Sequence, residues 1–160
     1  MRLVIAAVGR LKDGPERDLF DRYRSRLEAS GRALGWGPVQ VGEINESRAS
    51  DATSRQNEEA DRLLAKAGEI GAKVVLDEDG RQFTSEAFAT FMRDQREKGA
   101  RSLAFVIGGP DGHGEKMLAG ADLKLSLGAM TLPHMLARVL LAEQLYRAAT
   151  ILTGHPYHRA

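Results

Sequence analysis

The segment HPYHR, close to the end of the sequence, gathers side chains that could transfer protons and bind anions. It contains His155, Tyr157, His158 and Arg159, and Arg147 precedes it on a predicted helix. An unperturbed imidazole titrates at about pH 6.5, so a neutral histidine can accept a proton at neutral pH. A tyrosine ring can stack on a base, and a guanidinium stabilises negative charge. These residues form our first candidate site.

The two histidines of this segment could also suggest a metal site. The sequence has no cysteine, and no carboxylate stands near His155 and His158. Zinc sites normally recruit more protein ligands than two imidazoles. We therefore expect no metal ion to bind there.

A glycine-rich loop is the second candidate site. FVIGGPDGHG brings Gly108, Gly109, Gly112 and Gly114 directly after an apolar run. In open α/β sheets, ligands bind beyond the carboxyl ends of strands, where glycines let the backbone approach closely. The loop matches neither GxGxxG nor the phosphate-binding P-loop. It could contact a ligand, or the glycines and Pro110 could simply form a sharp turn.

Alternating strands and helices should position both candidates. Apolar runs and alternation predict strands over residues 3–8, 39–41, 73–77, 102–107 and 123–128. Apolar spacing and helix-end residues predict helices over 15–31, 50–67, 84–99 and 134–152. This order favours a single α/β domain over residues 1–160, with a mainly parallel sheet and helices on both faces.

The last predicted helix is apolar at nearly every angle. Its polar groups form two small islands, His134 with Arg138 and Glu143 with Arg147. A helix of this kind is buried on more than one side, which favours a homodimer interface over a central core helix. Glu143 and Arg147 are four residues apart, so they could form an ordinary surface ion pair.

Composition limits the class of protein. The 160 residues are 42% hydrophobic and 28% charged, which is ordinary for a soluble globular protein, and the absence of cysteine fits a reducing compartment. The first apolar run is too short for a signal sequence or a membrane span, so we expect a cytoplasmic protein. The net charge of +1 gives no global basic field, although a local patch could exist. Its members would be Arg10, Lys12, Arg22, Arg24 and Arg26, although such residues more commonly form a solvated face.

Four segments together resemble one family. FVIGGPDG, LSLGAMTLPH, RVLLAEQLYRA and HPYHR, with the start MRLVIAAVG and the strand-turn VVLDEDG, are similar to the RlmH family of the SPOUT superfamily. That family methylates N3 of pseudouridine 1915 in 23S ribosomal RNA. The resemblance spans the whole chain and implies an α/β trefoil knot over about residues 105–160. It also implies S-adenosylmethionine as cofactor, a homodimer, and the assembled 70S ribosome as substrate.

The resemblance also assigns the cofactor site. The carried-over positions are a strand end, the first glycine of the IGG motif and the loop before the PH pair: Leu76, Gly108, Leu127, Gly128, Ala129, Met130, Thr131 and Leu132. Small and apolar residues suit a pocket for adenine and methionine. At 127 to 129 the family varies in side chain, so position matters more than identity there. The sequence has PDG where the family usually has PEG.

By the same resemblance, the tail handles the target nucleotide. His158 would accept the N3 proton or position the base, and Tyr157 would stack on the base or bond to it. Arg159 and Arg147 would stabilise the negative charge left on the carbonyl oxygens, with contributions from different subunits possible. His155 would be structural. The modest net charge suits an enzyme that needs a preformed ribosomal site more than naked RNA.

Two other interpretations compete with this one. A related SPOUT methyltransferase could act on a different ribosomal or transfer RNA nucleotide with the same fold and cofactor. A module that binds RNA without catalysis could keep the fold and lose turnover. The HPYHR segment argues against the first and the intact Gly108 region against the second.

Overall fold

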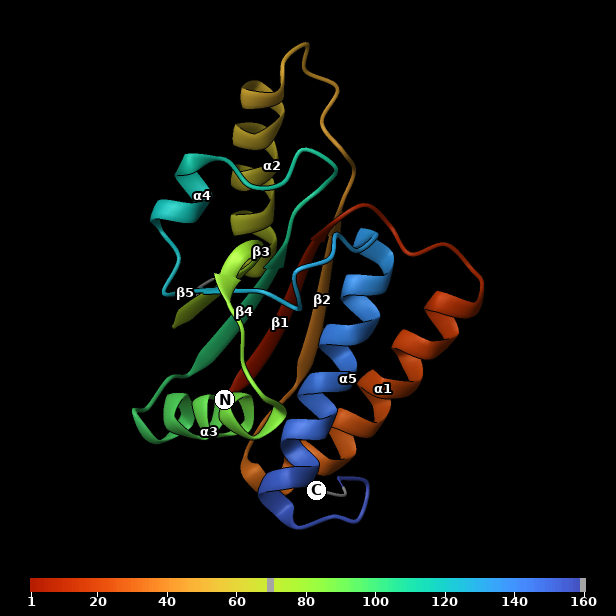
Figure 1. Cartoon of the computed structure of the whole chain (residues 1–160), viewed down its shortest axis with the longest axis vertical. Helices are drawn as coiled ribbons and strands as arrows, with labels where there is room; N and C mark the ends of the chain where they lie inside the picture. The colour runs from red at the N-terminus through yellow and green to blue at the C-terminus, as the bar shows by residue number, and fades with distance from the viewer. Residues whose placement is uncertain (69–70, 159–160) are drawn as a thin grey trace.

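Five parallel strands form one sheet at the centre of the computed structural model, which describes residues 1–68 and 71–158 (Figure 1). The strands are β1 Arg2–Val8, β2 Val39–Ile44, β3 Ala72–Arg81, β4 Ser102–Ile107 and β5 Leu123–Leu125, in the order β2-β1-β4-β3-β5. All four pairings within the sheet are parallel. The predicted α/β class with a mainly parallel sheet is confirmed.

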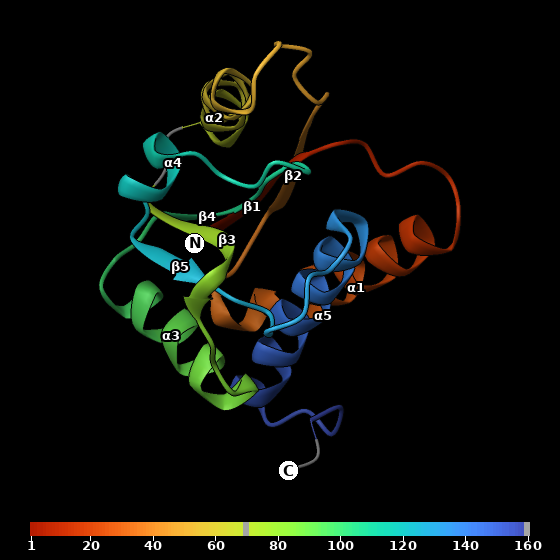
Figure 2. The same ribbon diagram turned by 45° about the horizontal axis from the view of Figure 1, so that its top comes forward.

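Helices cover both faces of this sheet (Figure 2). Alternate side chains of β1 point to opposite sides, so Leu3 and Ile5 face one core and Val4 faces the other. The first core packs against the helices α1 Pro15–Gly31, α3 Ser85–Glu97 and α5 His134–Thr153. The second packs against α2 Ala52–Ala67 and α4 Glu115–Ala119. Burial on both faces explains why β1 and β4 are apolar throughout.

Local signals set the helix ends. Pro15 stands at the start of α1, and a short 3-10 turn, Arg32–Leu34, follows the helix. Asp51 caps α2 by accepting a hydrogen bond from the Ser54 amide at 2.8 Å. Thr84 rather than Ser85 caps α3, because its hydroxyl accepts from the Ala87 amide at 3.1 Å. The predicted helices therefore agree with the structure to within a few residues.

Three elements differ from the prediction. Helix α4 was not predicted, since five residues are too few to show a periodic pattern. Strand β3 runs to Arg81, beyond the expected end at residue 77, and contains an irregularity between Leu76 and Arg81. Strand β5 has three residues instead of six, because Ser126 turns the chain by bonding to Gly128. The end of β5 lies very close to the end of β3.

Gly80 permits this close approach of β5 to β3. A Cβ atom placed on Gly80 would lie 2.7 Å from the backbone carbonyl carbon of Leu125. Real Cβ atoms do not approach a backbone so closely, so only glycine fits there without a shift of the chain. The end of β5 therefore passes directly against the end of β3.

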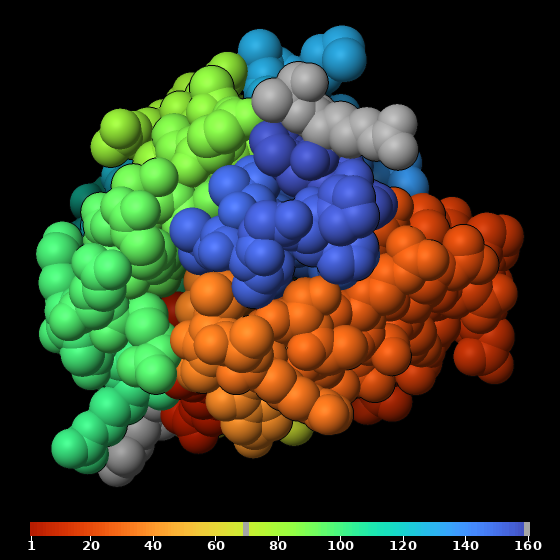
Figure 3. All heavy atoms as spheres, turned by 90° about the horizontal axis from the view of Figure 1, so that it is seen from below, coloured from red at the N-terminus to blue at the C-terminus, as the bar shows by residue number. Residues whose placement is uncertain are grey.

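Helix α5 is mainly a core helix. It lies between α1 and α3, as the view from below shows (Figure 3). Ten of its residues are buried, including Leu141 and Leu145, so contacts within this chain cover most of its apolar surface. Leu136 and Leu140, one turn apart, remain 44% and 41% exposed. None of the helices in the described part of the chain has the length and apolar character needed to cross a bilayer.

Candidate functional site

A cavity of about 700 Å³ opens at the carboxyl ends of β3, β4 and β5. Three segments line it: the end of β3, the glycine-rich loop after β4, and the chain between β5 and the first turn of α5. These segments converge because every strand of a parallel sheet ends at the same edge. A cavity of this size can hold a small organic molecule.

The structure brings most of the predicted cofactor residues together at this cavity. Seven of the eight positions line it, namely Leu76, Gly108, Leu127, Gly128, Met130, Thr131 and Leu132. Ala129 is exposed and is absent from the lining. The glycine-rich loop therefore borders a cavity and is more than a turn, although its contact with a ligand stays a prediction.

Sequence reasoning missed several groups in this cavity. Asp77, Glu78 and Asp79 border it on one side, and His134 and Ala137 come from the first turn of α5. The acidic residues were visible in VVLDEDG, but they were interpreted only as a turn. Their charge gives this side of the cavity a negative character.

His113 is the most informative of the missed residues. It lines the cavity, and its Nε2 atom is buried with no hydrogen-bond partner among the described residues. Burial lowers the pKa of His113, and a hydrogen bond with the backbone of Val106 opposes this effect. The imidazole is therefore neutral at pH 7 and has one free nitrogen for a bound molecule. A lone histidine in GGPDGHG was the available signal.

This buried imidazole predicts a pH dependence of stability. Because its pKa is lower in the folded state, His113 takes up a proton more readily in the unfolded chain, and stability falls as pH drops below about 6.5. The variant His113→Leu should therefore lose less free energy of unfolding between about pH 7.5 and 5.5 than the unsubstituted protein. Urea unfolding at the two pH values measures this. The exposed His155, replaced by Gln, provides the control, and an equal pH response in His113→Leu and in the unsubstituted protein would contradict the prediction.

The tail is held by a network centred on Glu143. Arg147 donates to Glu143 Oε1 from Nη2 at 2.6 Å and from Nε at 2.9 Å, and the Tyr157 hydroxyl donates to the same oxygen at 3.0 Å. The Tyr157 ring lies 4.6 Å from the Tyr146 ring, between centroids, and under the Arg147 guanidinium. Glu143 and Arg147 thus form more than a surface ion pair.

Burial, with hydrogen bonds to Tyr23 and Glu143, raises the pKa of the Tyr157 hydroxyl far above its usual range. The hydroxyl therefore stays protonated and continues to donate to Glu143. His158 Nε2 lies 3.2 Å from Glu86 Oε1 on α3, and His155 Nδ1 accepts from the Tyr157 amide at 3.1 Å. These contacts anchor the tail. Arg159 lies outside the described residues.

Within this chain the tail and the cavity are separate. Arg147, Tyr157 and His158 do not line the cavity, and Glu143 follows His134 by nine positions on α5. At 1.5 Å per residue this is about 14 Å along the helix axis. The structure therefore places the predicted cofactor residues near the first turn of α5 and the predicted tail residues around Glu143, further along the helix. The two groups do not meet within one chain. In residues 1–68 and 71–158, no group of three or more His, Asp or Glu side chains could hold a metal ion.

Comparisons with known proteins give the family. Residues 1–158 match the sequence model of a protein family that is described as predicted SPOUT methyltransferase. A protein of Xanthobacter autotrophicus named ribosomal RNA large subunit methyltransferase H is 52% identical over 160 residues, and the match covers all of both chains. A protein of the same name from Nitrobacter hamburgensis is 51% identical over 159 residues, with 99% of each chain covered.

A structural comparison adds a more distant likeness. The SpoU methyltransferase AviRb from Streptomyces viridochromogenes, solved with AdoMet, has a TM-score of 0.40 and 14% identity, over 95% of this chain and 60% of that one. That score is too low to carry an argument. The family model and the full-length relatives agree without it, and the chain belongs to the SPOUT methyltransferase family.

Proposed function

We propose that this protein uses S-adenosylmethionine to methylate N3 of pseudouridine 1915 in the 23S RNA of assembled ribosomes. The observation that carries the proposal is the single cavity that gathers Leu76, Gly108 and the segment before α5. Two full-length relatives at 51% and 52% identity carry the name of a large-subunit ribosomal RNA methyltransferase. The HPYHR tail supports the particular nucleotide by resemblance.

The residues of the cavity suit this cofactor. Much of the lining is backbone or small and apolar side chains, which fits the adenine ring and the methionine chain. Asp77, Glu78 and Asp79 border the same space, and their charge complements a ligand that carries a sulfonium and an ammonium group. When bound, the cofactor supplies an activated methyl group. The cavity would bind it, orient it and exclude water from it.

The tail would prepare the nucleotide. In our proposal His158 accepts the N3 proton, and Arg147 and Arg159 stabilise the negative charge that develops on the neighbouring carbonyl oxygens. Tyr157, held as a donor to Glu143, contacts the base. Because tail and cavity lie apart within one protomer, we propose a homodimer in which the tail of one subunit completes the cavity of its partner.

Exposed apolar side chains support such a homodimer. Leu136 and Leu140 form a stripe on α5, and Met130, which is 81% exposed, stands at the edge of the cavity. A second copy seated over this stripe would cover apolar surface beside the cavity. The close passage of Leu125 against Gly80 is compatible with the proposed trefoil knot over about residues 105–160. The proposed ribosomal substrate implies a protein of the cytoplasm.

Methyl transfer from labelled S-adenosylmethionine tests the proposal. The acceptors are 70S ribosomes that lack this modification, with free 23S RNA in parallel, and the labelled nucleoside is then identified. We expect label on N3 of that single pseudouridine, with ribosomes strongly preferred. Label on another nucleotide would refute the target, and cofactor binding without transfer to any RNA would refute the activity.

A further inference from the structure

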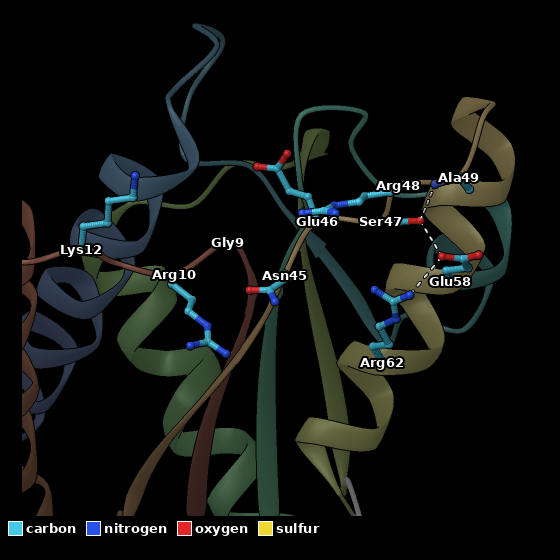
Figure 4. A pocket seen from close by; sticks show the side chains of 10 residues that line it. All are labelled: Gly9, Arg10, Lys12, Asn45, Glu46, Ser47, Arg48, Ala49, Glu58 and Arg62. Carbon is cyan, nitrogen blue, oxygen red and sulfur yellow. Dashed lines mark hydrogen bonds and ion pairs between the residues drawn. The ribbon is translucent and has the colours of Figure 1, made fainter.

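A second cavity, of about 930 Å³, opens at the carboxyl ends of β1 and β2 (Figure 4). It is lined by the segment after β1, the segment after β2, and one side of α2: Gly9, Arg10, Lys12, Asn45, Glu46, Ser47, Arg48, Ala49, Glu58 and Arg62. We call it the basic cavity. None of the residues assigned to cofactor or tail lies in it.

Positive charges outnumber negative charges in the basic cavity. Glu58 accepts hydrogen bonds from the Ser47 hydroxyl at 2.5 Å and from Arg62 at 3.0 Å, so it is neutralised within the cavity. Arg10, Lys12 and Arg48 are exposed and make no ion pair with a described residue. With Glu46 as the remaining carboxylate, the cavity has a net charge of +2, more than the +1 of the whole chain. Positive charge is therefore concentrated here.

The backbone that carries two of these cations is held in place. Arg138, fully buried on α5, donates from Nη2 to the Gly9 carbonyl at 3.0 Å and from Nη1 to Glu43 at 2.5 Å. The Leu11 amide donates to the same Glu43 oxygen at 3.0 Å. Arg10 and Lys12 thus flank a buried, hydrogen-bonded residue and project from a fixed segment into solvent.

The basic cavity and the cofactor cavity are neighbours. A Cβ atom on Gly9, which lines the basic cavity, would lie 3.1 Å from Nε2 of His134, which lines the cofactor cavity. Gly9 has φ +83°, a conformation that favours glycine, and the bare backbone lets the imidazole pack closely. A polymer that presents one nucleotide to the cofactor cavity can therefore reach the basic cavity with a neighbouring part of its backbone.

We propose that the basic cavity binds the phosphodiester backbone of the RNA substrate, beside the nucleotide that is methylated. Arg10, Lys12 and Arg48 contact phosphates and set the position of the strand, without reading its sequence. This inference rests on the proposed function, since it requires an RNA substrate. It also explains how a chain of low net charge can engage RNA: the cations are gathered at one place.

The test replaces all three cations, in the variant Arg10→Gln/Lys12→Gln/Arg48→Gln. Binding to undermethylated 70S ribosomes is measured by sedimentation over a series of salt concentrations. Log K falls as log salt rises, and loss of three phosphate contacts should reduce the steepness of this fall by about 2. Affinity at about 0.1 M salt should fall at least tenfold. Binding of S-adenosylmethionine should be unchanged.

The control removes the same charge elsewhere. Arg93→Gln/Lys98→Gln/Arg101→Gln removes three exposed cations from α3 and the segment before β4, outside the basic cavity, and should keep the affinity and slope of the unsubstituted protein. Equal binding by both triple variants, or no salt-dependent binding by the unsubstituted protein, would overturn the inference. Methyl transfer is measured on the same samples to keep the two proposals apart. If the unsubstituted protein does not methylate but the two triple variants differ in binding, only the proposed function fails. If it methylates but the two variants bind equally, only the inference about the basic cavity fails.

Discussion

Co-expression of two inactive variants should restore about a quarter of the methyl transfer of the unsubstituted protein. One variant, Gly108→Val, damages the cofactor cavity, because even a Cβ atom at Gly108 would lie 3.1 Å from Gly112 and 3.2 Å from the His113 ring. The other, His158→Ala, removes the proposed proton acceptor, which should cost about 100-fold or more in rate. Random pairing makes half of the dimers mixed, and each mixed dimer contains one complete site.

This result depends on tails that act across the dimer. A protomer with an intact cavity then receives an intact tail from its partner. If each tail acted within its own chain, every intact tail in the mixture would face a damaged cavity. Activity no higher than that of either variant alone would place tail and cavity in the same protomer. The double variant co-expressed with unsubstituted protein is the control, because its mixed dimers should be inactive. Gel filtration checks that each variant assembles, and cofactor binding should be retained by His158→Ala and lost in Gly108→Val.

Replacement of Glu43 by Leu should lower the free energy of unfolding by roughly 3 kcal/mol, because it leaves a buried guanidinium without its charge partner. Arg138 is 0% exposed, and the carbonyls of Val8 and Gly9 would become its only described acceptors. Glu43 keeps some solvent contact, so we expect the low end of the range for broken buried pairs. Urea unfolding at fixed protein concentration measures the change.

The double variant Glu43→Leu/Arg138→Met gives the matched comparison. It removes both charges, and apolar side chains of similar size can replace a buried pair at little cost. It should therefore be more stable than Glu43→Leu alone. A double variant as unstable as the single one would show that the loss comes from Glu43 contacts other than Arg138, such as the Leu11 amide.

Periodicity and apolar runs could predict the framework of this fold. β1 and β4 are buried on both faces and are therefore apolar along their length, and α2 ends at Gly68 as its pattern indicates. Helix α5 shows where such reasoning stops. Its all-round apolar pattern favoured an interface over a core, and only the packing against α1 and α3 showed that most of it is core.

The candidate site was predictable only in part. The glycine-rich motif after an apolar strand indicated Gly108, whereas the segment before α5 was assigned only through the family resemblance. Arg138 gave no sign of burial, because its partner Glu43 is 95 positions away in the sequence. The free nitrogen of His113 depends on what surrounds the loop, which no spacing rule contains. The separation of the tail from the cavity likewise became visible only in the structure, where α5 holds the two apart.

The strand order has a consequence for how the chain folds. Strand β1 lies beside β4, with Leu3 opposite Leu103, so the centre of the sheet cannot close until about two thirds of the chain has been synthesised. Until then β1 can pair only with β2, and its other edge is an open row of amides and carbonyls along an apolar strand. Pairings between distant segments also slow folding. We therefore expect newly made chains to aggregate most readily before β4 is in place.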